Sequence, residues 1–180
     1  MVKNILFGLG ALVLIIIALG FVLPDRVHVE REAVINAPQE EVFALISDFE
    51  AWNSWSPWAE KDPNAQYTHT GAGVGQKMVW ASDDPNVGNG SQEITKLDEP
   101  NMLVTHLEFD GMGEADASFT LSPAENGGTK VVWAFDTAMR KGAPIYMMPM
   151  STYMGFLMDG WVGKDYEQGL ANLKEVAEAD

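Results

Sequence analysis

The side chains of this 180-residue chain that could perform acid–base or metal chemistry are three histidines and several acidic residues. General acid–base catalysis needs a group with a tuned pKa inside a pocket. His28 and His69 lie near the ends of expected strands, and His106 alternates with Leu103 and Leu107 to the opposite face. There is no cysteine, and the histidines lack metal-ligand spacing. The sequence therefore indicates no catalytic residue, and it predicts neither a metal site nor a cofactor.

Three of the six tryptophans, Trp52, Trp55 and Trp58, lie within residues 50–63. Pro57 disfavours a helical conformation at Ser56, so the side chain of Trp58 should point in a different direction from those of Trp52 and Trp55. The three indoles could fill one end of the core, form the wall of a ligand cavity, or contact a membrane interface. Packing is the favoured interpretation because each indole buries a large apolar area.

Three polar side chains, Gln92, Thr105 and Thr137, fall on the apolar side of strand-like patterns. A buried polar group needs a partner, so these side chains should bond one another, bond water, or orient a ligand. Inward-pointing Glu93 or Asp136 would instead favour an enzyme, because either carboxylate could take part in proton transfer.

Residues 5–23, ILFGLGALVLIIIALGFVL, contain no charged side chain. At ~1.5 Å per residue they match the ~30 Å hydrocarbon core of a bilayer, which predicts a transmembrane helix. A cleaved signal peptide is the alternative, although its apolar region is usually shorter. Lys3 favours a cytoplasmic N-terminus. We therefore expect an anchor at residues 1–25 and a domain at residues 26–180 that faces the periplasm or the cell surface as part of a single-pass membrane protein.

The chain has a formal net charge of −15, and all its acidic residues follow residue 23. Nucleic acid is excluded as a partner because phosphate binding depends on clustered Lys and Arg. The acidic surface also gives no attraction to anionic lipid headgroups.

Alternating apolar and polar residues predict a first strand at 27–35, and apolar residues at helical spacing predict two short helices between 36 and 61. Turn-separated strands are expected at 65–70, 76–82, 90–98, 102–109, 114–122 and 129–139, and a long helix at 158–180. Pro144 and Pro149 should keep the methionine-rich segment between them out of regular helix. The expected fold is α+β, with a curved antiparallel sheet wrapped around the C-terminal helix.

Four segments together resemble the SRPBCC superfamily, also called START-like, with the helix-grip fold: INAPQEEVFALISDFEAWNSWSPW, GVGQKMVWASDDPNVGNGSQEIT, the Trp of VVWAFD, and GKDYEQGLANLK. Within it the chain is most similar to bacterial polyketide cyclase/dehydrase-like members, some of which carry a membrane anchor. The resemblance covers residues 27–178 and implies an apolar cavity between sheet and terminal helix, used by relatives for lipids, steroids or polyketides. It implies no particular activity.

The resemblance and the alternation of the strands together select candidate ligand contacts, each of which could equally be ordinary core. The leading hypothesis is a membrane-anchored domain that binds a hydrophobic small molecule or lipid. The alternative is a cyclase/dehydratase-like enzyme in the same cavity, and whether the chain is an enzyme stays open. The candidate contacts are Trp55, Met78, Trp80, Gln92, Thr105, Phe109, Phe119, Trp133, Phe135, Met154, Met158 and Trp161.

Overall fold

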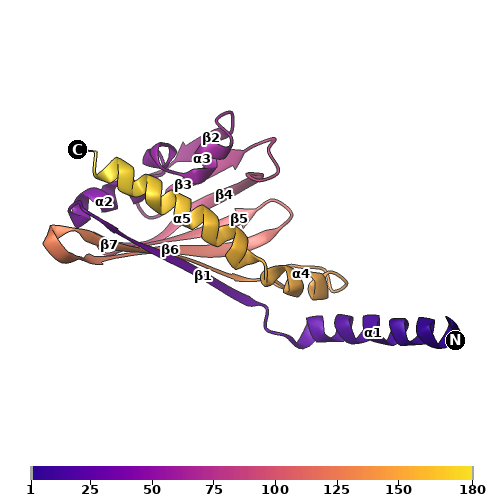
Figure 1. Ribbon diagram of the computed structural model, residues 1–180. Coiled ribbons are helices and arrows are strands. Elements are labelled where there is room, and N and C mark those ends of the chain that lie inside the picture. Colours follow the sequence, from indigo (N-terminus) through magenta and orange to yellow (C-terminus); the bar gives the residue numbers. More distant parts are fainter. Residues whose placement is uncertain (1, 180) are drawn as a thin grey trace.

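The computed structural model describes residues 2–179, apart from the side chain of Asn126, and its centre is one seven-stranded antiparallel sheet (Figure 1). The spatial order is β1-β7-β6-β5-β4-β3-β2, so the first strand joins the last while the others form a meander. The expected strands are all present within one or two residues of their expected ends. They are β1 (Arg26–Ile35), β2 (Gln66–Thr70), β3 (Lys77–Ala81), β4 (Asn89–Asp98), β5 (Met102–Phe109), β6 (Gly113–Pro123) and β7 (Thr129–Ala138).

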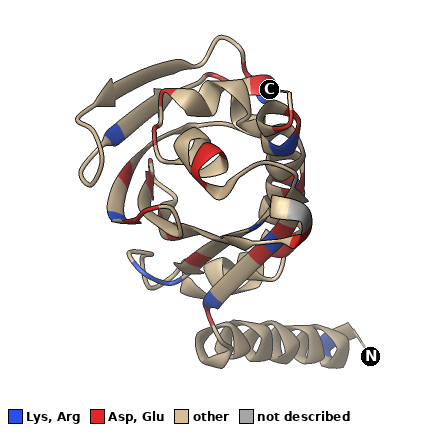
Figure 2. Ribbon diagram, turned by 90° about the vertical axis from the view of Figure 1, so that its left-hand side faces the viewer, with Lys and Arg blue, Asp and Glu red and all other residues tan. Residues whose placement is uncertain are grey.

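The sheet curves around the long helix α5 (Met158–Ala177), which confirms the α+β helix-grip prediction (Figure 2). Short helices follow the first strand as expected: α2 (Gln39–Ile46), the 3-10 turn η1 (Ala51–Ser54) and α3 (Pro57–Lys61). A second 3-10 turn, η2 (Glu125–Gly127), joins β6 to β7.

The methionine-rich segment contains a helix, α4 (Met148–Gly155), that the sequence analysis did not predict. Pro149 lies in its first turn, where the missing N–H costs nothing because the first N–H groups of a helix have no intrahelical partner. The expectation that Pro144 and Pro149 keep the residues between them out of regular helix holds as far as Met147, and Pro149 lies in the first turn of the helix that follows.

Two glycines let α5 approach the sheet closely. A Cβ atom on Gly169 would lie 2.7 Å from Cζ3 of Trp133, and one on Gly163 would overlap the guanidinium of Arg31. That guanidinium extends from β1 to α5, where it donates to Glu167 over 2.6 Å and to Asp159 over 3.0 Å. Both glycines interrupt the apolar pattern of the helix because the sheet occupies the space that a side chain would need.

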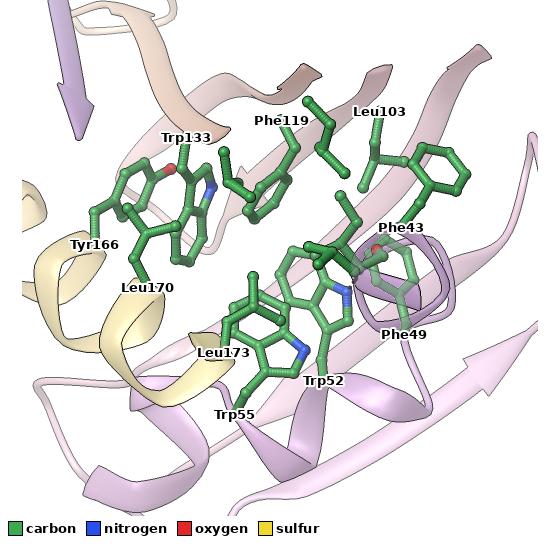
Figure 3. Close-up of a cluster of buried hydrophobic side chains, with 14 of the residues drawn as sticks. Phe43, Phe49, Trp52, Trp55, Leu103, Phe119, Trp133, Tyr166, Leu170 and Leu173 are labelled. Atoms are coloured by element: carbon green, nitrogen blue, oxygen red, sulfur yellow. Dashed lines mark hydrogen bonds between the residues drawn. The ribbon is translucent and has the colours of Figure 1, made fainter. Parts of the chain in front are cut away.

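Aromatic side chains fill the space between the C-terminal half of α5, α2 and the sheet (Figure 3). Trp52 and Trp55 are buried there, and their indole N–H groups donate to the carbonyls of Ile46 (2.8 Å) and Leu45 (2.9 Å). Trp52 and Trp55 therefore pack the core, with each of their N–H groups bonded to a carbonyl at the end of α2. Trp58 is only partly buried and, like Trp52, also borders the cavity described below.

Helix α1 (Val2–Val22) extends away from the domain beyond β1, and it is long and apolar enough to cross a membrane or to act as a signal sequence. Its residues are exposed, except for Gly20, which is buried. Its contacts with the domain are made mainly with α4 (Figure 1).

Candidate ligand-binding cavity

The N-terminal half of α5, helix α4 and the concave face of the sheet enclose a cavity of about 780 Å³. Cavities that hold small molecules in proteins measure roughly 300 to 1,000 Å³. The aromatic core ends where this cavity begins, so the space between sheet and helix is filled at one end and hollow at the other.

Eight of the twelve candidate residues line the cavity, and strand alternation explains the five that come from the sheet. Met78 and Gln92 are cross-strand partners in β3 and β4, so their side chains share a face. Gly90 leaves room for the ring of Trp80, since a Cβ atom there would lie 2.5 Å from Cζ2 of the indole. The eight residues are Met78, Trp80, Gln92, Phe109, Phe135, Met154, Met158 and Trp161.

Four candidates lie outside the cavity lining: Trp55, Thr105, Phe119 and Trp133. The three aromatic residues belong to the filled end, where Phe119 stacks on Trp133 with ring centroids 4.7 Å apart. Thr105 faces the interior but is covered by Gln92, whose Nε2 donates to Thr105 Oγ1 over 2.8 Å. These four side chains therefore lie outside the cavity lining, and the structure brings only the other eight candidates together around it.

The polar members of the lining are largely neutral. Gln92 is buried and uses its amide nitrogen on Thr105, and the hydroxyl of Thr137 donates to the carbonyl of Glu114 over 2.7 Å. Within residues 2–179, no protein group donates to Oε1 of Gln92, which leaves this oxygen able to accept a hydrogen bond from a ligand. Of the three polar side chains noted in the sequence, Gln92 and Thr105 thus bond one another, and Thr137 bonds a backbone carbonyl.

Tyr67 lines the cavity and was missed by the sequence analysis, because β2 carries the weakest strand pattern. Its cross-strand pairing with Trp80 was the signal that could have found it. The Tyr67 hydroxyl is buried without a hydrogen-bond partner among the described residues, and burial raises the pKa of this phenol. A buried hydroxyl without a partner costs free energy, so this group is poised to bond a ligand or water.

The sequence analysis identified only some of the methionines that form the flexible rim of the cavity. Met147 and Met150 join Met154 along α4 and the segment before it, and Leu107 and Tyr166 are further lining residues from β5 and α5. Methionine side chains are unbranched and polarizable, so they adapt to ligands of differing shape.

Charged groups lie at the cavity edge in ion pairs: Lys61 with Asp165 at 2.5 Å, and Lys141 with Glu114. Glu93 and Asp136 are exposed, so the carboxylates whose inward orientation would favour an enzyme do not face the cavity. Between residues 2 and 179, no group of three His, Asp or Glu side chains is placed to hold a metal ion.

A family model described as "Polyketide cyclase / dehydrase and lipid transport" matches residues 26–178. The chain belongs to this family. The match covers every strand, helices α2 to α5 and thus the whole cavity, and it confirms the SRPBCC assignment. A comparison with curated protein sequences gives no match.

Solved structures of low sequence identity share the fold. A protein of unknown function from Staphylococcus aureus has a TM-score of 0.61 at 11% identity, over 87% of this chain and 99% of its own. A Thermobifida fusca protein has a TM-score of 0.60 at 19% identity, over 83% and 92%. The Aha1 dimer from Colwellia psychrerythraea gives 0.54 at 17% identity, over 84% and 96%. The family and the fold together suggest a ligand-binding domain.

Proposed function

We propose that this protein is a membrane-anchored domain that binds a hydrophobic small molecule or lipid in its internal cavity. The observation that carries the proposal is the cavity itself, about 780 Å³ and lined by methionine, tryptophan, phenylalanine and leucine side chains. Removing an apolar ligand from water into such a site is favourable by ~25 cal/mol for each Å² buried.

The neutral polar groups of the cavity define the ligand further. Gln92 offers a hydrogen-bond acceptor, and the Tyr67 hydroxyl can donate or accept. A ligand that is mostly apolar and carries a hydroxyl, carbonyl or protonated carboxyl group satisfies both requirements. A fully charged headgroup does not belong inside, because the charged residues that line the cavity within residues 2–179 are already paired and cannot offset its desolvation.

Helix α1 is the proposed anchor, with residues 1–25 as the membrane segment and residues 26–180 as the binding domain. Lys3 near the N-terminus supports a cytoplasmic N-terminus and a domain on the outer side of the membrane. In Figure 2, the positions of basic and acidic residues are distributed over the domain. Helix α1 contains a single charged residue, Lys3. A lipid-soluble ligand is concentrated in the membrane, which makes tethering beside it useful.

The second candidate is a cyclase/dehydratase-like enzyme acting on a hydrophobic substrate in the same cavity. The Tyr67 hydroxyl favours it, because a buried phenol without a partner can donate a hydrogen bond to a substrate carbonyl. Its raised pKa keeps it protonated at neutral pH, which suits a donor and opposes a role as general base.

Native mass spectrometry of the full chain, released from mild detergent, tests ligand binding. Leu107→Trp places an indole in the cavity, and Val104→Trp places the same side chain on the opposite face of β5. We expect a bound hydrophobic molecule on the wild type and on Val104→Trp, with occupancy reduced several-fold on Leu107→Trp. Equal occupancy in all three would mean that the ligand lies elsewhere.

A further inference from the structure

We infer that an apolar surface beside the cavity mouth is a membrane-docking face, whose occupant is the same bilayer that holds α1. The inference rests on the proposed anchor and goes beyond it, because it assigns a second membrane contact to the folded domain. The face consists of six side chains that are 50–79% exposed: Ile145, Tyr146, Met150, Phe156, Leu157 and Trp161.

The composition of the face is unusual for this chain. Residues 142–158 contain no charged side chain, although the protein as a whole carries a net charge of −15. Contiguous exposed apolar residues in a soluble domain mark an interaction surface. Tyr146 and Trp161 are of the residue types enriched at the membrane–water interface, which is consistent with a lipid partner.

Arg140 fixes this region to the end of α1. Its guanidinium donates to the carbonyls of Gly20, Phe21 and Leu23 over 3.0–3.2 Å, and it pairs with Asp25 at 3.1 Å. The last carbonyls of a helix have no intrahelical partner, so an arginine that bonds them stabilises the helix end. The position of α1 relative to the docking face is therefore set by defined polar contacts.

Helix α4 lies beside the C-terminal part of α1 (Figure 1). Pro149 packs on Gly20, where any Cβ atom would lie 2.6 Å from the proline Cα and Cβ, and the Tyr153 hydroxyl donates to the carbonyl of Ile16 over 2.6 Å. Ile16 precedes the end of α1 at Val22 by six residues, which at 1.5 Å per residue is about 9 Å. Interfacial helices bury their apolar faces ~5–10 Å into a bilayer, so α4 reaches the depth typical of such helices.

The docking face is continuous with the cavity. Met150 and Trp161 belong to both, and Met147 and Met154 line the cavity from the same segment. Insertion of this face therefore places the cavity mouth at the lipid surface. A ligand can then pass between bilayer and cavity along methionine side chains, without crossing water.

Site-directed spin labelling tests the inference on the full chain, which contains no cysteine to interfere. Ile145→Cys and Phe156→Cys carry nitroxide labels on the docking face, and Val79→Cys carries the matched label on the outer face of β3. The chain is reconstituted in vesicles of phosphatidylethanolamine and phosphatidylglycerol. Collision rates with oxygen and with a water-soluble nickel chelate then report the depth of each label.

The inference predicts an oxygen-to-nickel accessibility ratio at positions 145 and 156 that is several-fold above the ratio at 79. Equal ratios at all three positions would overturn it. Protection from both reagents, with dipolar broadening that grows with protein density, would identify a second copy as the occupant and also overturn it. Ligand occupancy measured on the same samples keeps the two proposals separate, since the cavity can bind a ligand whether or not the face is inserted.

Discussion

Tyr166 of α5 stacks on Trp133 of β7 with ring centroids 3.8 Å apart and an interplanar angle of 11°. Trp133 belongs to the filled aromatic core, whereas Tyr166 also lines the cavity. The pair therefore forms the boundary between the part of the domain that provides stability and the part that provides a ligand site. Its closeness depends on Gly169, one turn further along α5.

Gly169→Ala should destabilise the domain by about 1–3 kcal/mol, because the new methyl group meets Trp133 and Pro57 in a packed core. Gly160→Ala is the matched control in the same helix, since nothing lies within 4 Å of a Cβ atom there. The control should leave the free energy of unfolding unchanged or raise it by up to about 1 kcal/mol. Urea unfolding in detergent measures both, and equal effects would refute the close approach.

Tyr67→Phe should weaken ligand binding about 3- to 10-fold, the equivalent of one neutral hydrogen bond of roughly 1 kcal/mol. Its free energy of unfolding should not fall, because the hydroxyl that it removes is buried without a protein partner. Thr68→Val, which removes an exposed hydroxyl from the opposite face of the same strand, is the control. Titration of the bound hydrophobic molecule checks the affinity, and loss of stability without loss of affinity would contradict the assignment.

His28 should make the free energy of unfolding depend on pH, and the direction of this dependence follows from its surroundings. A hydrogen bond to Asp136 (2.8 Å), together with Glu30 at 3.4 Å, raises the pKa of His28 above its ordinary value. A pKa that is higher in the folded state than in the unfolded state stabilises the fold fully below about pH 6.5. That contribution is lost as pH rises through the folded value. Because the pair is exposed to solvent, it contributes less than about 1 kcal/mol.

The His28→Gln variant tests this sign. The difference in unfolding free energy between wild type and variant should be largest near pH 5.5 and should fall to a constant residual value near pH 9, since His28 is charged only at the lower pH. A difference that is constant across this range would show that the charge of His28 does not contribute.

Arg140→Ala should loosen α1 from the domain, because it removes the donor to three carbonyls at the helix end and the partner of Asp25. Distances between spin labels at Phe7→Cys in α1 and Val79→Cys in β3 should change from a narrow to a broad distribution. Arg26→Ala, at a neighbouring exposed arginine for which the structure shows no side-chain bond among residues 2–179, should leave the distribution narrow. An unchanged width in Arg140→Ala would mean that packing of Pro149 on Gly20 suffices.

Strand alternation indicates which face of each strand turns toward the cavity. Met78, Trp80 and Phe109 face inward as the period of two requires. Alternation alone cannot distinguish Phe135, which lines the cavity, from Trp133, two residues earlier on the same face. That difference arises because tryptophans from a distant segment fill only one end of the space, which local periodicity does not encode.

The other contacts that the sequence did not predict also depend on residues far apart in the chain. Arg31 falls on the inward side of β1, and its ion pairs with α5 depend on Gly163, which leaves room for the guanidinium; no local pattern of either segment indicates this pair. The contact between α1 and α4 joins distant segments, with Tyr153 and Ile16 separated by 137 residues, so no local sequence pattern indicates it. Tyr67 was hidden because its short strand is recognisable mainly through its pairing with β3.

Photocrosslinking in membranes tests the central claim most directly. The full chain is reconstituted with a fatty acid that carries a diazirine near the end of its chain, irradiated, digested and analysed by mass spectrometry. The account predicts adducts on cavity-lining residues of β3, β5 and β7, such as Met78, Phe109 and Phe135, and their loss in Leu107→Trp. Adducts confined to α1 and the outer surface of α4, unchanged by Leu107→Trp, would contradict it.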